Sequence, residues 1–466
     1  MTDSNKSLDT VDESAWPLLK AERTWGQFEL GIVLLVAASA TWCYIIGEYA
    51  GYYLNFKMGF ASMTAGAMIG MLLVTVAVVP SATKYGIDSI SSSKPQFGNR
   101  GWIINVFLQY VSIIGWNSLL LIFFGKSVSQ LLTTLGIVGE GGAVWVIPVS
   151  TAIACAIVYG VLLKGTSGIE RISKILFLFI IAVGVWMIYM LMTHQADAIA
   201  SAKPAYASGS LRWDYTTGIE IGIVSLLSWW PYIGAMVRVA PNAHTATLPS
   251  MLGMGLPVPI LSVIGLAAIL ALETSDPSAW LVQLGGPGYG SIALLFVIAA
   301  NLGTAVIGVY ASAIGLKHIP KVSKMSWNTT VLLGIVPVAL IGIFIPDLFF
   351  NNFGTFLAFI GVFFAPLVAI QIVDYFILRK QTLNIRSIYD NSENSDYAYW
   401  GGFNPAAIAA MAAGFFTYIY LLDPLTYESQ SPYEILTASL PTAVVGGLVY
   451  LIVTKVLVQP AKRGGY

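Results

Sequence analysis

The residues of this sequence that could carry chemistry are polar side chains set inside long apolar segments. A buried amide or hydroxyl costs free energy unless it is paired, so these groups should face one another or a water-filled cavity. Grouped there, they could bind a small polar solute or a cation. They are Ser39, Thr41, Glu48, Gln109, Ser112, Asn117, Ser118, Glu220, Ser225, Ser228, Asn301, Thr304, Ser312, Gln371 and Asp374.

Trp116 and Asn117 are adjacent in the middle of one apolar segment. An aromatic face beside an amide suits a planar heterocycle, which stacks on the ring and forms hydrogen bonds through its edge. Tryptophan is also common where helices pack against each other. On the residues alone, a binding role and a packing role for Trp116 both stay open.

Three carboxyl groups fall inside or near the apolar segments. Glu48 and Glu220 lie about one turn from an outer helix end, where each could bind a proton or sense a cation. Each could instead extend into the membrane interface; the position of Glu220 favours this second interpretation, and that of Glu48 favours neither. Asp374 is followed closely by Arg379, which predicts a structural pair near the cytoplasmic end of its helix.

An enzymatic function finds little support. His194, His244 and His318 fall in or beside loops on different sides, so they cannot share one metal. No HExxH, GxSxG or Walker pattern occurs, no loop is large enough for a nucleotide site, and no channel filter sequence is present. We therefore expect no catalytic residues and no cofactor. A secondary transporter is the class that remains.

Membrane-spanning helices must position these side chains. Hydrophobic residues make up 57% of the chain and charged residues only 10%, whereas soluble domains contain about 25% charged residues. A helix needs about 20 apolar residues to cross the bilayer, and about twelve segments qualify, which predicts an all-α integral membrane protein. They lie at residues 28–51, 60–80, 102–125, 144–163, 174–193, 217–237, 250–272, 289–315, 329–349, 354–378, 403–422 and 434–458.

The distribution of charge predicts the topology. With the N-terminus inside, every Lys and Arg lies on the cytoplasmic side except Lys57, Lys126, Lys203 and Arg212. We expect a multi-pass plasma-membrane protein with both termini cytoplasmic and no cleavable signal peptide. The predicted organisation is a tail at residues 1–25, one transporter domain at 26–460, and a second tail at 461–466. The net charge of zero gives no basic field for nucleic acid.

Two short stretches resemble each other. Residues 41–47 and 228–234 share a hydroxyl, a tryptophan, an isoleucine and a glycine at the same offsets, five predicted helices apart. Both mix glycine, proline or small polar residues into an apolar helix. Paired interrupted helices of this kind indicate a transporter site between inverted repeats. Chance similarity between aromatic-rich helices is the alternative that stays open.

Several further stretches, in order along the chain, resemble the nucleobase–cation symporter family 1, which contains cytosine, allantoin and uracil permeases and the hydantoin transporter. The likeness extends from about residue 21 to about residue 410, and its most specific part is the helix 10 signature. The stretches are 21–23 before helix 1, 85–88 and 95–101 between helices 2 and 3, 353–357, 365–367, 372–376 and Arg379 in helix 10, and 399–404 at the start of helix 11.

The resemblance implies a LeuT-like fold, in which five helices are followed by five related through inverted topology and then by two more. The first repeat would cover residues 26–203, the second 212–390, and the last two helices 400–460. Helices 1 and 6 would be broken at the midplane of the membrane. Their free main-chain groups, near residues 38–43 and 225–229, would line the substrate site.

The resemblance also implies site residues. Trp116 falls where the family places a stacking tryptophan, and Ser225 and Ser228 fall where cytosine permeases carry serines near the substrate. Leu226 replaces a second aromatic residue, so either Trp229 or Trp230 would supply that ring, or the cargo would be stacked on one face only. Leu120 replaces a glutamine of the hydantoin transporter, so its hydrogen bond should be absent. Asn117, Asn301 and Thr41 would complete the polar edge of the site.

A cation site is implied between helices 1 and 8. Thr304 matches one hydroxyl ligand, Gly303 stands where a second would be, and Ala300 supplies a carbonyl. On helix 1 the matching carbonyls would be near Ser39 and Trp42. Sodium would bind this oxygen-rich site, whereas coupling to protons would make Glu48 the carrier.

The sequence thus predicts a symporter that imports a nucleobase or related heterocycle with Na⁺ or H⁺ by alternating access. Its expected partners are that small molecule and the lipid bilayer, with no obligate protein partner. An amino-acid or other small-solute transporter of the same fold is the main alternative, although the run Ala-Ala-Ser-Ala-Thr-Trp at residues 37–42 argues mildly against it. A receptor that binds without transport and a membrane enzyme also stay open. The heterocycle, the coupling ion and the oligomeric state are not determined by the sequence.

Overall fold

The fold is a bundle of helices. The computed structural model describes residues 15–139, 143–163, 176, 182–272 and 276–466. Within these ranges the only β-structure is two isolated bridges. The long elements are α3 (Phe56–Tyr85), α5 (Trp102–Thr134), α6 (Ala143–Leu162), a helix at Ala182–His194, α11 (Ala243–Gly253) leading into α12 (Pro257–Leu272), α14 (Ser291–Leu316), α16 (Trp327–Phe344), α18 (Phe353–Ile372), α20 (Pro405–Leu421) and α22 (Ser439–Val453).

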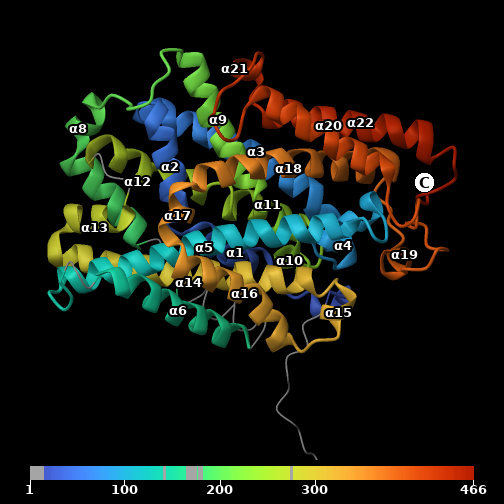
Figure 1. Cartoon of the computed structure of the whole chain (residues 1–466), viewed down its shortest axis with the longest axis horizontal. Helices are drawn as coiled ribbons and strands as arrows, with labels where there is room; N and C mark the ends of the chain where they lie inside the picture. The colour runs from blue at the N-terminus through green and yellow to red at the C-terminus, as the bar shows by residue number, and fades with distance from the viewer. Residues whose placement is uncertain (1–14, 140–142, 164–175, 177–181, 273–275) are drawn as a thin grey trace, which may run out of the picture.

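These helices run mostly along the long axis of the molecule, as Figure 1 shows. Eight helices of the described chain are long and apolar enough to cross a membrane, and two bent pairs raise this number to as many as 10. The helices at Ala182–His194 and Pro405–Leu421 are shorter. Each predicted apolar segment overlaps one of these helices or pairs, which confirms the all-helical membrane fold. Residues 174, 175 and 177–181 of the fifth segment lie outside the described residues.

The two bent pairs are the predicted interrupted helices. Helix α1 (Gln27–Ala38) and α2 (Trp42–Tyr53) meet at 56°, and α9 (Leu211–Leu227) and α10 (Trp230–Val237) meet at 43°. Pro231 stands in the first turn of α10, where its missing N–H costs nothing and its fixed φ favours a helix start. Both breaks lie in the interior, since Ser39 and Ser228 are buried.

Close packing holds the interrupted helices in place. A Cβ atom on Gly222 of α9 would lie 2.6 Å from the Met63 carbonyl of α3, and Gly66 of α3 meets the Ile219 carbonyl in return. Helices α2 and α12 approach in the same way at Gly47 and Gly265. Small residues let backbones approach where no hydrophobic effect drives association. Gly70, one turn after Gly66 on α3, meets the Ile223 carbonyl of α9 in the same way.

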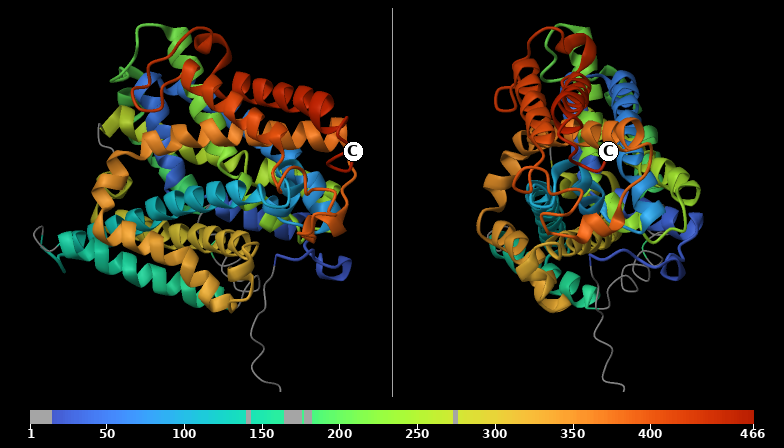
Figure 2. Two further views of the ribbon diagram at one scale, coloured as in Figure 1. Left: turned by 45° about the vertical axis from the view of Figure 1, so that its right-hand side comes forward. Right: turned by 90° about the vertical axis from the view of Figure 1, so that its right-hand side faces the viewer.

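Short helices close the two ends of the bundle. Helices α4 (Ser89–Phe97), α15 (Pro320–Ser323) and α19 (Ile385–Tyr389) lie at the same end as both ends of the described chain. Helices α8 (Ala196–Ser201) and α13 (Pro277–Gly285) lie at the opposite end (Figures 1 and 2). We call these the basic end and the far end, because Lys94, Lys317 and Arg379 belong to the first.

Glu220 is a structural carboxylate. Its side chain is only 3% exposed, so the expectation that it extends into the membrane interface is wrong. It accepts hydrogen bonds from Tyr418 Oη (2.9 Å), Ser439 Oγ (2.6 Å) and the N–H groups of Ala438 and Ser439 (3.2 and 3.0 Å). The two N–H groups belong to the start of α22, where the helix dipole favours a negative charge.

Asp374 forms the predicted pair with Arg379. It lies in a π-helical turn, Val373–Leu378, that extends α18, and its Oδ2 accepts a hydrogen bond from Arg379 Nε at 2.6 Å. Tyr450 and Tyr466 donate to its other oxygen at 2.9 and 2.8 Å. Arg379 also donates to the Gly464 carbonyl at 2.7 Å, so residues 464–466 are bound into the basic end of the bundle.

Candidate functional site

The interruption of the first bent pair is held by a side chain of α14. Asn301 Oδ1 accepts hydrogen bonds from both the N–H and the hydroxyl of Thr41, at 3.2 and 2.8 Å. The Thr41 N–H is thereby turned away from the helical partner four residues earlier, the carbonyl of Ala37. Thr41 and Asn301 are thus brought together as predicted, but they bind each other. The Asn301 amide nitrogen is buried and has no hydrogen-bond partner among the described residues.

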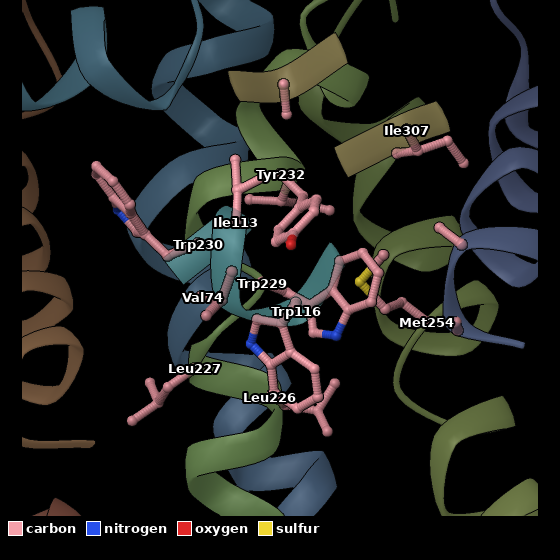
Figure 3. Packing of buried hydrophobic residues seen from close by; sticks show 14 of the residues in the cluster. Val74, Ile113, Trp116, Leu226, Leu227, Trp229, Trp230, Tyr232, Met254 and Ile307 are labelled. Carbon is pink, nitrogen blue, oxygen red and sulfur yellow. The ribbon is translucent and has the colours of Figure 1, made fainter. Parts of the chain in front are cut away.

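Aromatic rings from three helices converge between the two breaks. The Trp42 ring centroid lies 5.3 Å from that of Trp116 and 5.7 Å from that of Trp229. Tyr232 packs on Trp229 at 4.7 Å. Figure 3 shows Trp116, Trp229 and Tyr232 gathered at the centre of the bundle. They enclose a cavity of about 10 Å³, lined by Trp42, Trp116, Leu120, Ser228, Trp229, Tyr232 and Thr304, which we call the aromatic cavity.

The second ring of the site comes from Trp229. Trp230 points away from the cavity, as Figure 3 shows, and its indole N–H donates to Gln371 Oε1 at 2.5 Å. This resolves the alternative that the sequence left open. Trp42 and Trp229 occupy the same position in the two similar stretches at residues 41–47 and 228–234. The two halves of the chain therefore contribute equivalent tryptophans to one cavity.

Trp116 is covered on the side that faces α18. Its ring centroid lies 5.1 Å from Phe353 and 6.2 Å from Phe356, both edge-on. Phe356 also packs against Gly115, where any side chain would collide with its ring. The indole N–H groups of Trp116 and Trp42 are buried and have no acceptor among the described residues. The cavity therefore offers hydrogen-bond donors together with flat aromatic surfaces.

Some predicted substrate residues lie off the cavity. Ser225 Oγ donates to the Ile221 carbonyl of its own helix, at 2.5 Å, while Ser228 Oγ donates to the Ser225 carbonyl and lines the cavity. Leu226 is fully buried near Trp116 (Figure 3) but is not among the lining residues. Asn117 packs against Gly308, and both its amide atoms have no hydrogen-bond partner within the described chain.

The predicted cation region lies just beside the cavity. Thr304 Oγ1 is 3.3 Å from the Val36 carbonyl and 3.2 Å from the Ala37 carbonyl, at the broken end of α1. These carbonyls precede the expected positions, Ser39 and Trp42, by several residues. The ring of Trp42 belongs to the aromatic cavity instead.

The remaining cation residues surround the same region. Ser39 and Ala300 line a second small cavity of about 20 Å³ together with Thr41. A Cβ on Gly303 would lie 2.6 Å from the Leu176 side chain, so that position is apolar. The Thr304 hydroxyl and the Val36 and Ala37 carbonyls are hard oxygen groups, the ligand type that cations such as sodium prefer, while Ser39 lines the neighbouring small cavity. Among the described residues, no group of three His, Cys, Asp or Glu side chains could hold another metal ion.

Glu48 lies apart from both cavities. It is buried in α2, nearer the far end, and Tyr52 Oη donates a short hydrogen bond to its carboxylate. At the far end, Lys126 and Asp276 form an ion pair at 3.9 Å. Glu48 lines neither the aromatic cavity nor the small cavity at Ser39.

Tyr232 is the cavity residue that sequence reasoning missed. It lies in the stretch 228–234, one helical turn after Trp229, so its side chain falls on the same face. That spacing is the signal that could have identified it. The ring role of Trp42 was missed for a different reason, since only its carbonyl was considered.

The chain was compared with known proteins. Residues 17–453 match the family described as permeases for cytosine/purines, uracil, thiamine and allantoin. The hydantoin permease of Microbacterium maritypicum is 22% identical over 433 residues, which cover 89% of this chain and 86% of that protein. A purine-uracil permease of Arabidopsis thaliana is 22% identical over 426 residues, covering 85% of this chain and 69% of that protein.

A solved structure shares the fold. Mhp1, a nucleobase-cation-symport-1 family transporter in a closed conformation with bromovinylhydantoin bound, superimposes with a TM-score of 0.79 at 18% identity. The superposition covers 97% of this chain and 96% of Mhp1. At this identity the likeness establishes the fold alone, and it agrees with the LeuT-like arrangement that the sequence predicted.

Proposed function

The chain belongs to the permease family for cytosine/purines, uracil, thiamine and allantoin, and from this premise we propose that it imports a planar heterocycle of the nucleobase type together with a cation. The observation that carries the proposal is the aromatic cavity, which lies at the crossing of the two interrupted helices. Relatives named as hydantoin and purine-uracil permeases support this class of cargo.

The donors in the cavity suit the edge of such a ring. A nucleobase presents flat faces for stacking, and its carbonyl oxygens and ring nitrogens accept hydrogen bonds. The indole N–H groups of Trp42 and Trp116 are the buried donors nearest to the cavity that have no acceptor within the described chain. A flat ring with acceptors on its edge would both pair with these donors and stack on the indoles, whereas an aliphatic amino acid has no flat face to stack.

The site is closed toward both ends of the bundle. Phe353 and Phe356 cover Trp116 from α18, and Ser89 of α4 bonds the Trp230 carbonyl of α10 at 2.7 Å. A cavity of about 10 Å³ is the room of about one water molecule. Cargo can therefore enter only when one closure opens and the rings separate. Alternate opening of the two closures would give transport by alternating access.

The cation would couple its gradient to this movement. We infer that sodium binds between the Val36 and Ala37 carbonyls and the Thr304 hydroxyl, because these groups join the broken end of α1 to α14. A cation there would favour the arrangement in which the two helices are close and so stabilise one state over another. Proton coupling through Glu48 is the competing mechanism.

We propose that the protein lies in the plasma membrane with its basic end in the cytoplasm. Lys and Arg are concentrated on the loops of that end, as they are in cytoplasmic loops of membrane proteins. Uptake would then begin at the far end, near α8 and α13. In this orientation the far end would open to the outside and the basic end to the cytoplasm.

Uptake by the purified protein in liposomes tests the proposal. A labelled panel of cytosine, uracil, hypoxanthine, allantoin and hydantoins would be offered with a sodium gradient, a proton gradient or neither. We expect Trp116→Ala to abolish saturable uptake of the active compound, since it removes one stacking face. Trp145→Ala is the matched control, because Trp145 of α6 is exposed on the surface. Unchanged kinetics for Trp116→Ala would remove the aromatic cavity from the transport path.

A further inference from the structure

A polar pocket lies at the basic end of the bundle and shares no lining residue with the aromatic cavity. Its volume is about 370 Å³. None of its lining residues is an aspartate or glutamate. Its wall includes Trp16, Lys94, Lys317, His318, Ser323 and Tyr389, and we call it the lysine pocket. Its lysines are Lys94 and Lys317, and Lys317 Nζ also donates to the Met325 carbonyl at 2.6 Å.

Lys94 of α4 is the unusual residue of this pocket. It is only 6% exposed, and its ammonium lies 5.1 Å from the ring centroids of both Trp102 and Tyr389. Within the described chain its nitrogen has neither a hydrogen-bond acceptor nor a carboxylate in ion-pair range. Burial lowers the pKa of Lys94 to about 8, although the charge of Asp88 acts in the opposite direction. The ammonium belongs to the pocket wall and has no anionic partner within ion-pair range among the described residues, so an anion in the pocket would pair with it.

Among the described residues, the carboxylate whose charge acts on Lys94 is Asp88, and its hydrogen bonds go to other groups. Both oxygens of Asp88 lie 3.0 Å from His318 Nε2, and Asp88 also accepts a hydrogen bond from the Ser91 N–H at 3.0 Å. Asp88 therefore satisfies His318 and the first turn of α4. Its charge acts on Lys94 from a distance, but its ion-pair partner is His318.

An aromatic wall stands opposite the basic groups. Trp16 stacks on Tyr389 with ring centroids 4.7 Å apart and planes at 24°. Trp16 is 62% exposed, so a face of its indole is open to a second ring. Tyr389 Oη donates to the Ala15 carbonyl at 3.0 Å, which fixes the chain before Trp16 against α19.

We propose that the lysine pocket binds a phosphate monoester. A phosphate presents several strong acceptor oxygens and about two negative charges, which matches the ammonium of Lys94, with Lys317 and the Ser323 hydroxyl in the same wall. The organic part of the ester would lie against Trp16. The source can be a soluble nucleotide or a lipid headgroup, because both carry this group.

Bound phosphate would hold the basic end closed. The pocket joins the segment at Trp16, α4, the end of α14 and α19. Helix α4 is itself tied to α10, since Ser89 Oγ donates to the Trp230 carbonyl and accepts from the Gly234 N–H at 3.1 Å. A ligand that fixes α4 would therefore slow the opening of the inner closure. This consequence, unlike binding itself, rests on the proposed transport function.

Binding to the purified full chain tests the inference without any transport assay. The probes are inorganic phosphate, adenosine monophosphate and adenosine, each added to protein in phosphatidylcholine nanodiscs and followed by calorimetry. We expect the monophosphate to bind and adenosine not to bind. Lys94→Met should weaken binding at least about tenfold, because a charged hydrogen bond is lost. Lys84→Met is the matched control, since Lys84 at the same end bonds the Gln381 carbonyl and lies outside the pocket.

Two further measurements separate a phosphate site from a general charge effect. Trp16→Ala should weaken the monophosphate more than inorganic phosphate, because only the nucleotide stacks. Affinity should also fall as pH rises through about 8, where Lys94 loses its proton. If soluble phosphates compete with phosphatidic acid in mixed nanodiscs and Lys94→Met weakens both, the site is supported and the lipid is its source.

Two results would overturn the inference. The first is no binding of any phosphate, soluble or lipid, to the wild-type chain. The second is equal binding by Lys94→Met and Lys84→Met. Failure of nucleobase uptake with intact phosphate binding would contradict the proposed function alone.

Discussion

Glu220 shows how similar carboxyl groups take different roles in this molecule. Its oxygens receive hydrogen bonds from Tyr418 and from the first residues of α22, so no lone pair is left for a cargo or a coupling ion. Glu48 has a single tyrosine partner among the described residues. The two carboxylates differ in the number of hydrogen-bond donors around them. That number depends on tertiary packing, so it cannot be predicted from the sequence.

We predict that Glu220→Ala destabilises the protein without entering the transport path. Removing the carboxylate leaves buried donors on Tyr418 and Ser439 unpaired, at a cost of about 3 kcal/mol in the free energy of unfolding. Thermal unfolding in detergent measures the loss. Glu393→Ala is the control, since Glu393 is exposed. Normal stability together with altered ion dependence of uptake would instead make Glu220 functional.

Thr304 allows a test of sodium coupling. Thr304→Val keeps the branched shape but removes the hydroxyl, so it should raise the sodium concentration for half-maximal uptake by about tenfold, as expected for about 1.4 kcal/mol of lost ligation. Thr304→Ser keeps the hydroxyl and should behave like the wild type. If uptake ignores sodium and collapses with a protonophore, the coupling site moves to Glu48.

Residues of the candidate site could be predicted where the type of side chain alone indicates a role. Trp116 and Trp229 line the cavity as expected. Asn117 does not, because neighbouring residues of a helix point about 100° apart, and the ring and the amide cannot both face one cavity. We expected the Trp42 carbonyl to bind the cation, but the Trp42 ring lines the aromatic cavity. The sequence shows the type of each residue, but it does not determine which way each side chain points around its helix.

At the scale of the elements, the interruption of two helices could be predicted, but the residues that lie at each interruption could not. Small polar residues and Pro231 mark the breaks of both bent pairs. The carbonyls that reach Thr304 belong to Val36 and Ala37 because Asn301 of a distant helix captures the Thr41 N–H. A contact between residues 260 positions apart decides that register.

Helix contact through glycine gives a prediction at the same scale. Gly222→Ala should destabilise the bundle by about 1–3 kcal/mol, because the new Cβ would lie 2.6 Å from the Met63 carbonyl and 2.7 Å from the Ala67 nitrogen. Gly160→Ala in α6 has open space around its Cβ and should be neutral or stabilising by up to about 1 kcal/mol. Thermal unfolding of the two variants in one detergent compares them. Equal stability would mean that α3 and α9 can separate freely.

The fold of the whole molecule was the easiest feature to predict, since length, hydropathy and charge together indicate a helical membrane protein.

The two ends of the bundle differ in how they are closed. Toward the basic end the closure is polar, because Ser89 Oγ donates to the Trp230 carbonyl of α10 and the Trp230 indole N–H donates to Gln371 Oε1. Toward α18 it is made of phenylalanine rings on Trp116. We expect the aromatic closure to open with fewer broken hydrogen bonds, so entry of cargo should be faster than release.

The Asp374–Arg379 pair has a consequence for how the protein is made. Tyr466, which donates to Asp374, is 92 residues further along the chain, and Gly464 accepts from Arg379. During synthesis, the tenth helix is inserted long before the ribosome has released these partners. Until residues 464 and 466 have been made, the ion pair lacks these two hydrogen bonds. Residues 464–466 therefore complete the hydrogen bonding of a helix that is synthesised much earlier.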